Sequence, residues 1–343
     1  MLHDFSTHRL FPLAVPALIA LAPTSAQAHV KWFCTFDVAG APVALANVLC
    51  QDFELLFTAS IVLLLVGCLV EGTPFGAALL RSLDSVTGVL RRHTEAVVRT
   101  VAGGFFLTLG LGMHVLLTPE LTTDLAFVPP LQLAMAGAML SRRTLPFASF
   151  GIVVLFGLAV AQYGVFHLMD YPVFLGLAAY LACVGSGRAP FNMRPLDLLR
   201  WAAAITLMWA AIEKWAFPQW TSPMFINHPN VSFGFDIAFY MRAAGVVEFA
   251  LAFALLCTPL MRRVSATILT AAFVAAIGEF GLIDAIGHSC IIAVMLAILA
   301  DDARAPVRRR TVLVMPISYS VTLAGFLMAY YGLHAAFFGG LAG

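Results

Sequence analysis

Histidine and carboxylate residues are the side chains of this sequence best suited to bind a metal ion or to transfer a proton. Six histidines fall in stretches that we expect at the outer side of a membrane: His29, His114, His167, His228, His288 and His334. Neutral imidazole is the commonest ligand of transition metals, and its usual pKa of about 6.5 leaves it ready to bind. The set favours a metal or redox site, although any single histidine is better explained by a bond to backbone or water.

The stretch from Glu279 to His288 is the densest polar cluster in the chain. It contains Asp284 four residues before His288, so these two side chains share a face if the stretch is helical. Asp284 could ligate a metal, orient His288 or transfer a proton, or the pair could simply tie a hairpin together. A charge at the centre of a membrane helix costs about 2.5–3.5 kcal/mol, so Glu248 and Glu279 should face a cavity or a partner. The predicted catalytic groups are Glu279, Asp284 and Glu248.

His29 carries the most specific hypothesis, because signal-peptide cleavage would make it the first residue of the mature chain. Residues 1–28 contain one arginine, a short apolar run and Ala26-Gln27-Ala28, a pattern typical of a cleaved secretory signal peptide. A leading histidine offers both its amino and its ring nitrogen, and copper(II) favours such tetragonal nitrogen sites. Copper is therefore the expected metal. The predicted ligands are His29, His114, His167, His228, Asp284 and His288.

The amino-acid composition indicates which class of protein holds these residues in place. The chain has 343 residues, of which 61% are hydrophobic and 11% charged, with a net charge of +1. A soluble domain has roughly 45–50% apolar and about 25% charged residues. The composition excludes a soluble globular enzyme, a disordered chain and a basic nucleic-acid binder. The P-loop, Rossmann, C-x-x-C, H-E-x-x-H and G-x-S-x-G motifs are all missing from the sequence, which disfavours ATP-driven transport.

Apolar segments predict about ten transmembrane helices. They lie near residues 53–71, 96–117, 125–140, 146–168, 171–185, 198–216, 236–258, 263–283, 286–300 and 311–334. Every second connection is basic, so the positive-inside rule places the mature N- and C-termini in the periplasm. By this topology the inner side holds 15 basic and 6 acidic residues, and the outer side 3 basic and 11 acidic ones. We therefore expect an all-α, multi-pass protein of the bacterial inner membrane, with an acidic, histidine-rich outer face.

Two stretches of the chain are similar at an offset of 117 residues. Gln162-Tyr163-Gly164 and the residues up to His167 align with Glu279-Phe280-Gly281 and the residues up to Asp284. This similarity predicts a tandem repeat of a four-helix unit. The expected segments are a signal peptide (1–28), a periplasmic segment (29–52), a first helix and inner loop (53–95), two repeats (96–197 and 198–302) and a C-terminal helix (303–343).

Residues 198–300 resemble a DoxX-like four-helix membrane unit. The features that carry the resemblance are Arg200, Trp209-Ala210-Ala211-Ile212-Glu213-Lys214, Gly245 with Glu248, Arg262-Arg263 and the stretch from Gly278 to His288. DoxX-related proteins are associated with redox chemistry, including a subunit of a thiosulfate:quinone oxidoreductase. The resemblance therefore implies a quinone-linked oxidoreductase subunit. The His29 segment and the added helices depart from the family pattern, so its substrate is not carried over.

The sequence as a whole predicts a periplasm-facing, metal-dependent redox membrane protein, with copper as the expected metal. Its substrate would be small or membrane-soluble, and its expected partners are the lipid bilayer and a redox subunit. The alternatives are metal binding or transport without catalysis, the DoxX-like quinone-linked subunit, haem ligation by histidine pairs, and a purely structural subunit. Cys34 and Cys50 would lie outside, where they could form a disulfide or serve as soft copper ligands.

Overall fold

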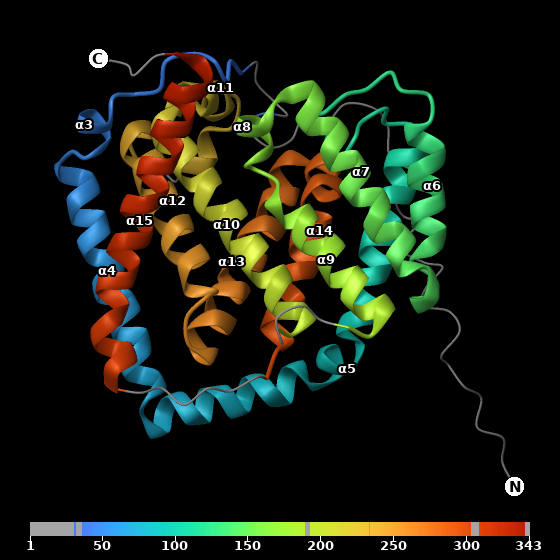
Figure 1. The fold of residues 1–343 in the computed structure, drawn as a ribbon. Helices are drawn as coiled ribbons and strands as arrows, with labels where there is room; N and C mark the ends of the chain where they lie inside the picture. The colour runs from blue at the N-terminus through green and yellow to red at the C-terminus, as the bar shows by residue number, and fades with distance from the viewer. Residues whose placement is uncertain (1–30, 32–35, 189–192, 233, 303–308, 340–343) are drawn as a thin grey trace, which may run out of the picture.

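The part of the chain that the structure describes consists of helices joined by turns and irregular connections. The computed structural model describes residues 31, 36–188, 193–232, 234–302 and 309–339 (Figure 1). Its longer helices are α4 (Gln51–Glu71), α5 (Pro74–Gly110), α6 (Val128–Ala138), α7 (Leu145–Tyr163), α9 (Pro172–Ser186), α10 (Pro195–Ala216), α12 (Ile237–Ala254), α13 (Pro259–Phe280), α14 (Leu282–Ala300) and α15 (Arg309–Phe338). Shorter helices between them are α3 (Leu45–Val48), η2 (Arg142–Thr144), α8 (Val165–Leu168), α11 (Pro218–Asn227) and η4 (Pro229–Ser232).

Seven of the described helices are long and apolar enough to cross a membrane. They are α4, α7 together with η2, α10, α12, α13, α14 and the apolar part of α15. This confirms the expectation of an all-α, multi-pass membrane protein, because only helices bond their own backbone within hydrocarbon. The remaining three predicted spans fall on α6, with 11 residues, on α9, with 15 residues, and on the second half of the 37-residue helix α5.

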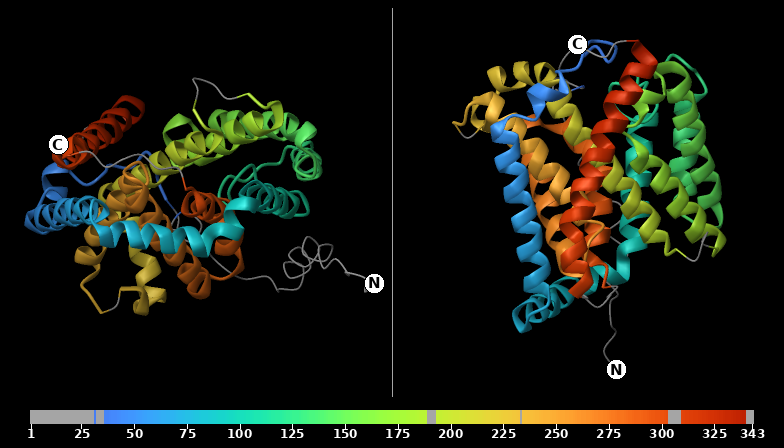
Figure 2. Two further views of the ribbon diagram at one scale, coloured as in Figure 1. Left: turned by 90° about the horizontal axis from the view of Figure 1, so that it is seen from below. Right: turned by 60° about the vertical axis from the view of Figure 1, so that its left-hand side comes forward.

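The connection predicted as an inner loop after the first span is helical instead. Thr73 caps it, because its hydroxyl accepts a hydrogen bond from the Gly76 amide at 3.2 Å, and Pro74 occupies the first helical position. The first part of α5 crosses beneath the other helices, as the view from below shows (Figure 2). Asp84 of α5 pairs with a buried arginine of α13: the Arg263 guanidinium lies 2.6 Å from the Asp84 carboxylate. The charged residues that suggested a loop are thus one side of an amphipathic helix.

The helices form two groups of four that meet mainly through two helix pairs. In the first group α5, α6, α7 and α9 are neighbours in that order, and in the second α10, α12, α13 and α14 follow the same order. Helix α9 packs against α10, and α5 packs against α14. Helix α4 lies against α12 and α13, and α15 lies beside α4 and α10 (Figure 2). The first and last membrane helices therefore cover the second group.

The two edges of the bundle differ in charge. One edge, at the bottom of Figure 1, carries the first part of α5 and the connections 139–144 and 255–258, and we call it the basic edge. The opposite edge carries the connections 111–127, 164–171 and 217–236 and the end of α15. The arginine-containing connections at the basic edge match those that the sequence placed on one side of the membrane.

Candidate functional site

The structure brings the predicted catalytic and metal-binding residues together only in pairs. Asp284 and His288 lie one turn apart on α14, with 3.0 Å between Oδ2 and Nδ1. Glu279, at the end of α13, lies 2.8 Å from His228, measured between Oε1 and Nδ1. Among the residues that the structure describes, no three His, Cys, Asp or Glu side chains are grouped as a metal site requires.

The other predicted residues have separate surroundings. Glu248 of α12 lies 2.6 Å from the Lys214 ammonium of α10, so it faces a partner as expected. His114 is exposed in the connection after α5, where its φ of 49° is the only positive value at a non-glycine residue of the described chain. His334 is buried on α15 and bonds the Val38 carbonyl at 3.1 Å. His29 and Cys34 lie outside the described residues, so the copper brace and the Cys34–Cys50 link stay predictions.

A buried ionic cluster at the opposite edge includes His167 together with residues that the sequence analysis did not select. We call it the Lys31 cluster, and its members are Lys31, Glu120, His167, Asp170, Tyr171 and Glu213. The Lys31 side chain is 1% exposed, and its ammonium contacts the Asp170 carboxylate and lies 2.7 Å from Glu213 Oε1. The rings of Phe36 and Trp220 also lie within cation–π distance, at 5.7 and 5.4 Å from the ammonium.

Burial sets the electrostatics of this cluster. Burial opposes the charge of Lys31, but the carboxylates of Asp170 and Glu213 outweigh it and raise the pKa of the ammonium. Burial raises the pKa of both Glu120 and Asp170, because each carboxylate loses its hydration. Burial, reinforced by the charge of Lys31, lowers the pKa of His167 to about 3. The imidazole is therefore neutral across the physiological range.

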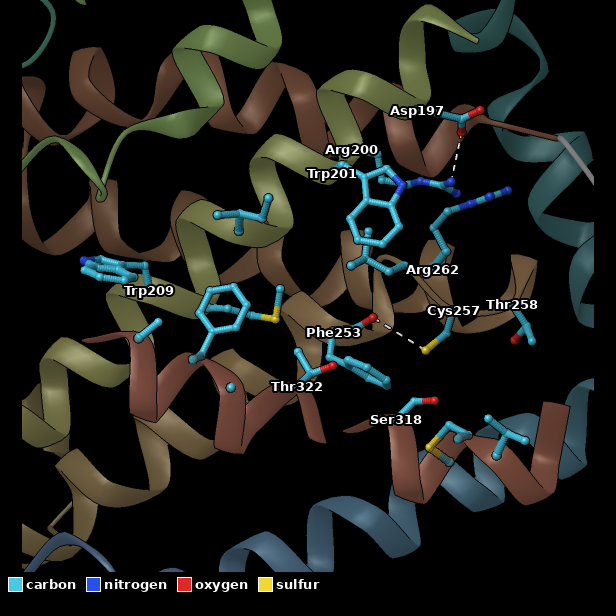
Figure 3. Close-up of a pocket in the computed structure, with 18 of the residues that line it drawn as sticks. Asp197, Arg200, Trp201, Trp209, Phe253, Cys257, Thr258, Arg262, Ser318 and Thr322 are labelled. Carbon is cyan, nitrogen blue, oxygen red and sulfur yellow. Dashed lines mark hydrogen bonds and ion pairs between the residues drawn. The ribbon is translucent and has the colours of Figure 1, made fainter. Parts of the chain in front are cut away.

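A cavity of about 1250 Å³ lies between α10, α12 and α15 (Figure 3). Its walls are mostly apolar and aromatic, and Trp209, Phe253 and Phe326 contribute large surfaces. Trp201 and Val314 also line it and are 48% and 43% exposed, so the cavity opens at the outer surface of the helix bundle. That surface faces lipid in a membrane-spanning bundle, which gives an apolar molecule a lateral route in.

One end of the cavity is charged, as the right-hand side of Figure 3 shows. Asp197 Oδ1 accepts from Arg194 and Arg200 at 2.7 and 2.9 Å, measured to their Nη2 atoms. Asp301 accepts from Arg194 at 2.9 Å and lies 3.2 Å from Arg262. Three guanidinium groups thus share two carboxylates, and a third carboxylate, that of Glu71, accepts a hydrogen bond from Thr258 in the same wall. The Arg200 Nε atom is buried and has no hydrogen-bond partner in the structure.

The opposite end of the cavity reaches toward the Lys31 cluster. Met169 and Trp209 line that end, and Met169 directly precedes Asp170. The Trp209 ring packs against Tyr330 at a centroid separation of 4.8 Å. The cavity can therefore hold an elongated molecule whose polar head lies at the arginines and whose apolar body lies along α10 and α15. Comparisons with protein-family models, with curated proteins and with solved structures found no match for this chain.

Proposed function

We propose that the protein binds a membrane-soluble amphiphile in the cavity between α10, α12 and α15. The observation that carries this proposal is the combination of apolar walls with a cluster of arginine side chains at one end of the same cavity. Ligand sites are typically mostly apolar, with a few polar groups that fix the orientation of the ligand. A head group that accepts hydrogen bonds, such as a quinone carbonyl or an acidic lipid head, complements the arginine end.

A quinone is the member of this class that connects the cavity with redox chemistry. The DoxX-like stretch 198–300 includes Arg200 and Arg262, and both line the charged end of the cavity. The quinone-linked subunit therefore has more structural support than the copper-dependent reading, in which the described ligands stand in separate pairs. The copper proposal depends on His29, and elemental analysis of the purified protein together with its intact mass tests it.

The number of membrane crossings, the internal repeat and the orientation in the membrane are also part of the proposal. We infer ten membrane crossings, with α6, α9 and the second half of α5 completing the seven longer spans. Two observations support a tandem repeat: the neighbour order within the two helix groups is the same, and the 117-residue offset relates Gly164 to Gly281. The basic edge would face the cytoplasm, and the mature termini the periplasm.

Two glycines of α15 provide a matched test of the cavity. Gly325 lines the cavity, and a side chain built there meets no atom within 4 Å. Gly332 lies two turns further along, is exposed, meets no atom either and does not line the cavity. Gly325→Phe should therefore place an aromatic ring inside the cavity, while Gly332→Phe places the same ring at an exposed position that does not line it.

The binding measurement uses the two variants and the native protein in lipid nanodiscs. Decylubiquinone and palmitate are titrated separately, and quenching or enhancement of tryptophan fluorescence reports occupancy beside Trp209 and Trp201. We expect the native protein and Gly332→Phe to bind at least one of the two probes with equal affinity, and Gly325→Phe to lose at least tenfold. Equal binding by all three proteins, or binding of neither probe by the native protein, contradicts the proposal.

A further inference from the structure

A second site lies in the Lys31 cluster, away from the charged end of the cavity. We propose that Glu120 holds an exchangeable proton there and shares it with His167. The site would thus bind a proton at the opposite edge of the membrane domain, and it does not depend on the amphiphile proposed for the cavity.

Glu120 is the carboxyl group of the cluster that contacts no cation among the described residues. Its side chain is 4% exposed, and Oε1 accepts hydrogen bonds from the hydroxyls of Tyr171 and Thr118. The Lys31 ammonium is committed to Asp170 and Glu213 instead. A carboxyl group that is buried without a cation takes up a proton rather than remain charged, because an isolated buried charge is very costly. Oε1, with two hydroxyl donors, is then the carbonyl oxygen, and Oε2 carries the proton.

His167 is the hydrogen-bond acceptor for the proton on Glu120. Its side chain is 2% exposed, and its Nε2 atom lies 4.0 Å from Glu120 Oε1. Both Nε2 of His167 and Oε2 of Glu120 are buried, and neither has a hydrogen-bond partner in the structure. The ring is held in place by Phe36, whose centroid is 5.3 Å away in a stacked arrangement. A protonated Glu120 and a neutral imidazole satisfy each other, either directly after a small rotation or through one water molecule.

The charges around the site favour the protonated state. Lys31 faces Asp170 and Glu213, and Lys214 pairs with Glu248 close by, so two ammonium groups already face three carboxylates. An ionised Glu120 would add a fourth negative charge to this region. Among the described residues, the other titratable groups beside the cluster are the hydroxyls of Tyr163 and Tyr330. Neither is a cation, so within the described part of the chain a proton on Glu120 limits the excess negative charge.

Glu120→Gln separates this proposal from a purely ionic role, because an amide has the shape of a protonated carboxyl group. Infrared spectra of the native protein in H2O and D2O should contain a protonated-carboxyl C=O band that shifts on deuteration, which shows exchange. We expect Glu120→Gln to lose that band and to keep the native melting temperature. His167→Phe should keep the band but move it to higher frequency, because the acid loses its acceptor.

Asp170→Asn is the matched control, since it changes a carboxylate that contacts Lys31 directly. It should lower the melting temperature and retain the protonated-carboxyl band. The proposal is overturned if the band persists in Glu120→Gln, or if Glu120→Gln lowers the melting temperature as much as Asp170→Asn does. A band that is unaffected by His167→Phe would contradict the shared proton while leaving the protonated Glu120 in place.

Discussion

The Nζ atom of Lys31 lies 2.7 Å from Oε1 of Glu213, which joins the segment before the first membrane helix to the end of α10. The same ammonium contacts Asp170, in the connection between α8 and α9. Because α9 belongs to the first helix group and α10 to the second, this one side chain contacts both groups. A segment that the sequence places outside the bundle therefore provides a buried counter-charge within it.

Replacing Lys31 by methionine should destabilise the protein strongly. Removing one member of a buried ion pair leaves its partners uncompensated, which typically costs about 3–5 kcal/mol. Arg91→Met is the control, because its pair with Asp302 is exposed, with side chains 37% and 54% exposed, and its loss should cost about 1 kcal/mol or less. Thermal unfolding in detergent compares the two variants. If the two variants lost the same amount of stability, the buried ion pairs of Lys31 would contribute no more than an exposed pair does.

Acid should weaken the folded state through His167. The pKa of this imidazole is lowered to about 3 by burial, whereas in the unfolded chain it is near the ordinary value of 6.5. Below about pH 6.5 the unfolded chain takes up the proton first, so stability falls progressively toward pH 3, in total by on the order of 4 kcal/mol. Unfolding measured at several pH values between 7.5 and 4 should show this loss.

His167→Phe is the variant that isolates the effect, because it keeps a ring against Phe36 and removes the titrating group. Burial raises the pKa of Glu120, so that group contributes in the opposite direction and gains stability as the pH falls. The native protein should therefore lose more stability on acidification than His167→Phe does. Identical pH profiles for the two proteins would exclude His167 as a source of acid sensitivity.

Much of the fold could be predicted from the sequence because membrane helices are encoded locally. A long apolar run identifies α4 or α14 without knowledge of its neighbours. The contact between Asp284 and His288 was similarly anticipated, because side chains four residues apart meet on one helix. The helical first part of α5 was missed because its arginines were taken for a loop, although their alternation with apolar residues fits an amphipathic helix.

The Lys31 cluster could not be predicted in the same way, since its members are brought together only by the tertiary fold. Lys31 and Asp170 are 139 residues apart, and Tyr171 and Glu120 are 51 residues apart. Each of these residues stands in the sequence as one charged or polar side chain in a connection, where solvent exposure is the ordinary expectation. The charged end of the cavity could not be predicted from the sequence either. Arg194 stands before α10 and Asp301 after α14, so only the tertiary fold brings them together.

The two glycines that end α7 and α13 should resist substitution. Gly164 has φ 84° and ψ 157°, and Gly281 has φ 80° and ψ −156°, a region that only glycine adopts without strain. Gly164→Ala and Gly281→Ala should each cost about 1–3 kcal/mol of unfolding free energy. Gly157→Ala on α7 is the control, because it is helical and meets no atom within 4 Å. A neutral result at Gly281 would mean that the break before α14 does not need this backbone conformation.

Close packing between α10 and α12 depends on Gly245. A Cβ atom at this position would lie 2.2 Å from the Trp215 indole nitrogen and 3.0 Å from the Ala211 carbonyl oxygen. The indole cannot retreat freely, because it is buried and donates a hydrogen bond to the Arg242 carbonyl at 3.2 Å. Gly245→Ala should therefore separate the two helices and cost about 1–3 kcal/mol, as overpacking does in other cores.

Gly278→Ala on α13 makes the same chemical change without the clash. No atom lies within 4 Å of its added methyl group, and alanine favours a helix by up to about 1 kcal/mol over glycine. Thermal melts of the two variants in the same detergent should thus move in opposite directions. If both variants melt at the native temperature, the approach of α12 to Trp215 is loose enough to accept a methyl group, and this contact does not fix the spacing of α10 and α12 beside the cavity.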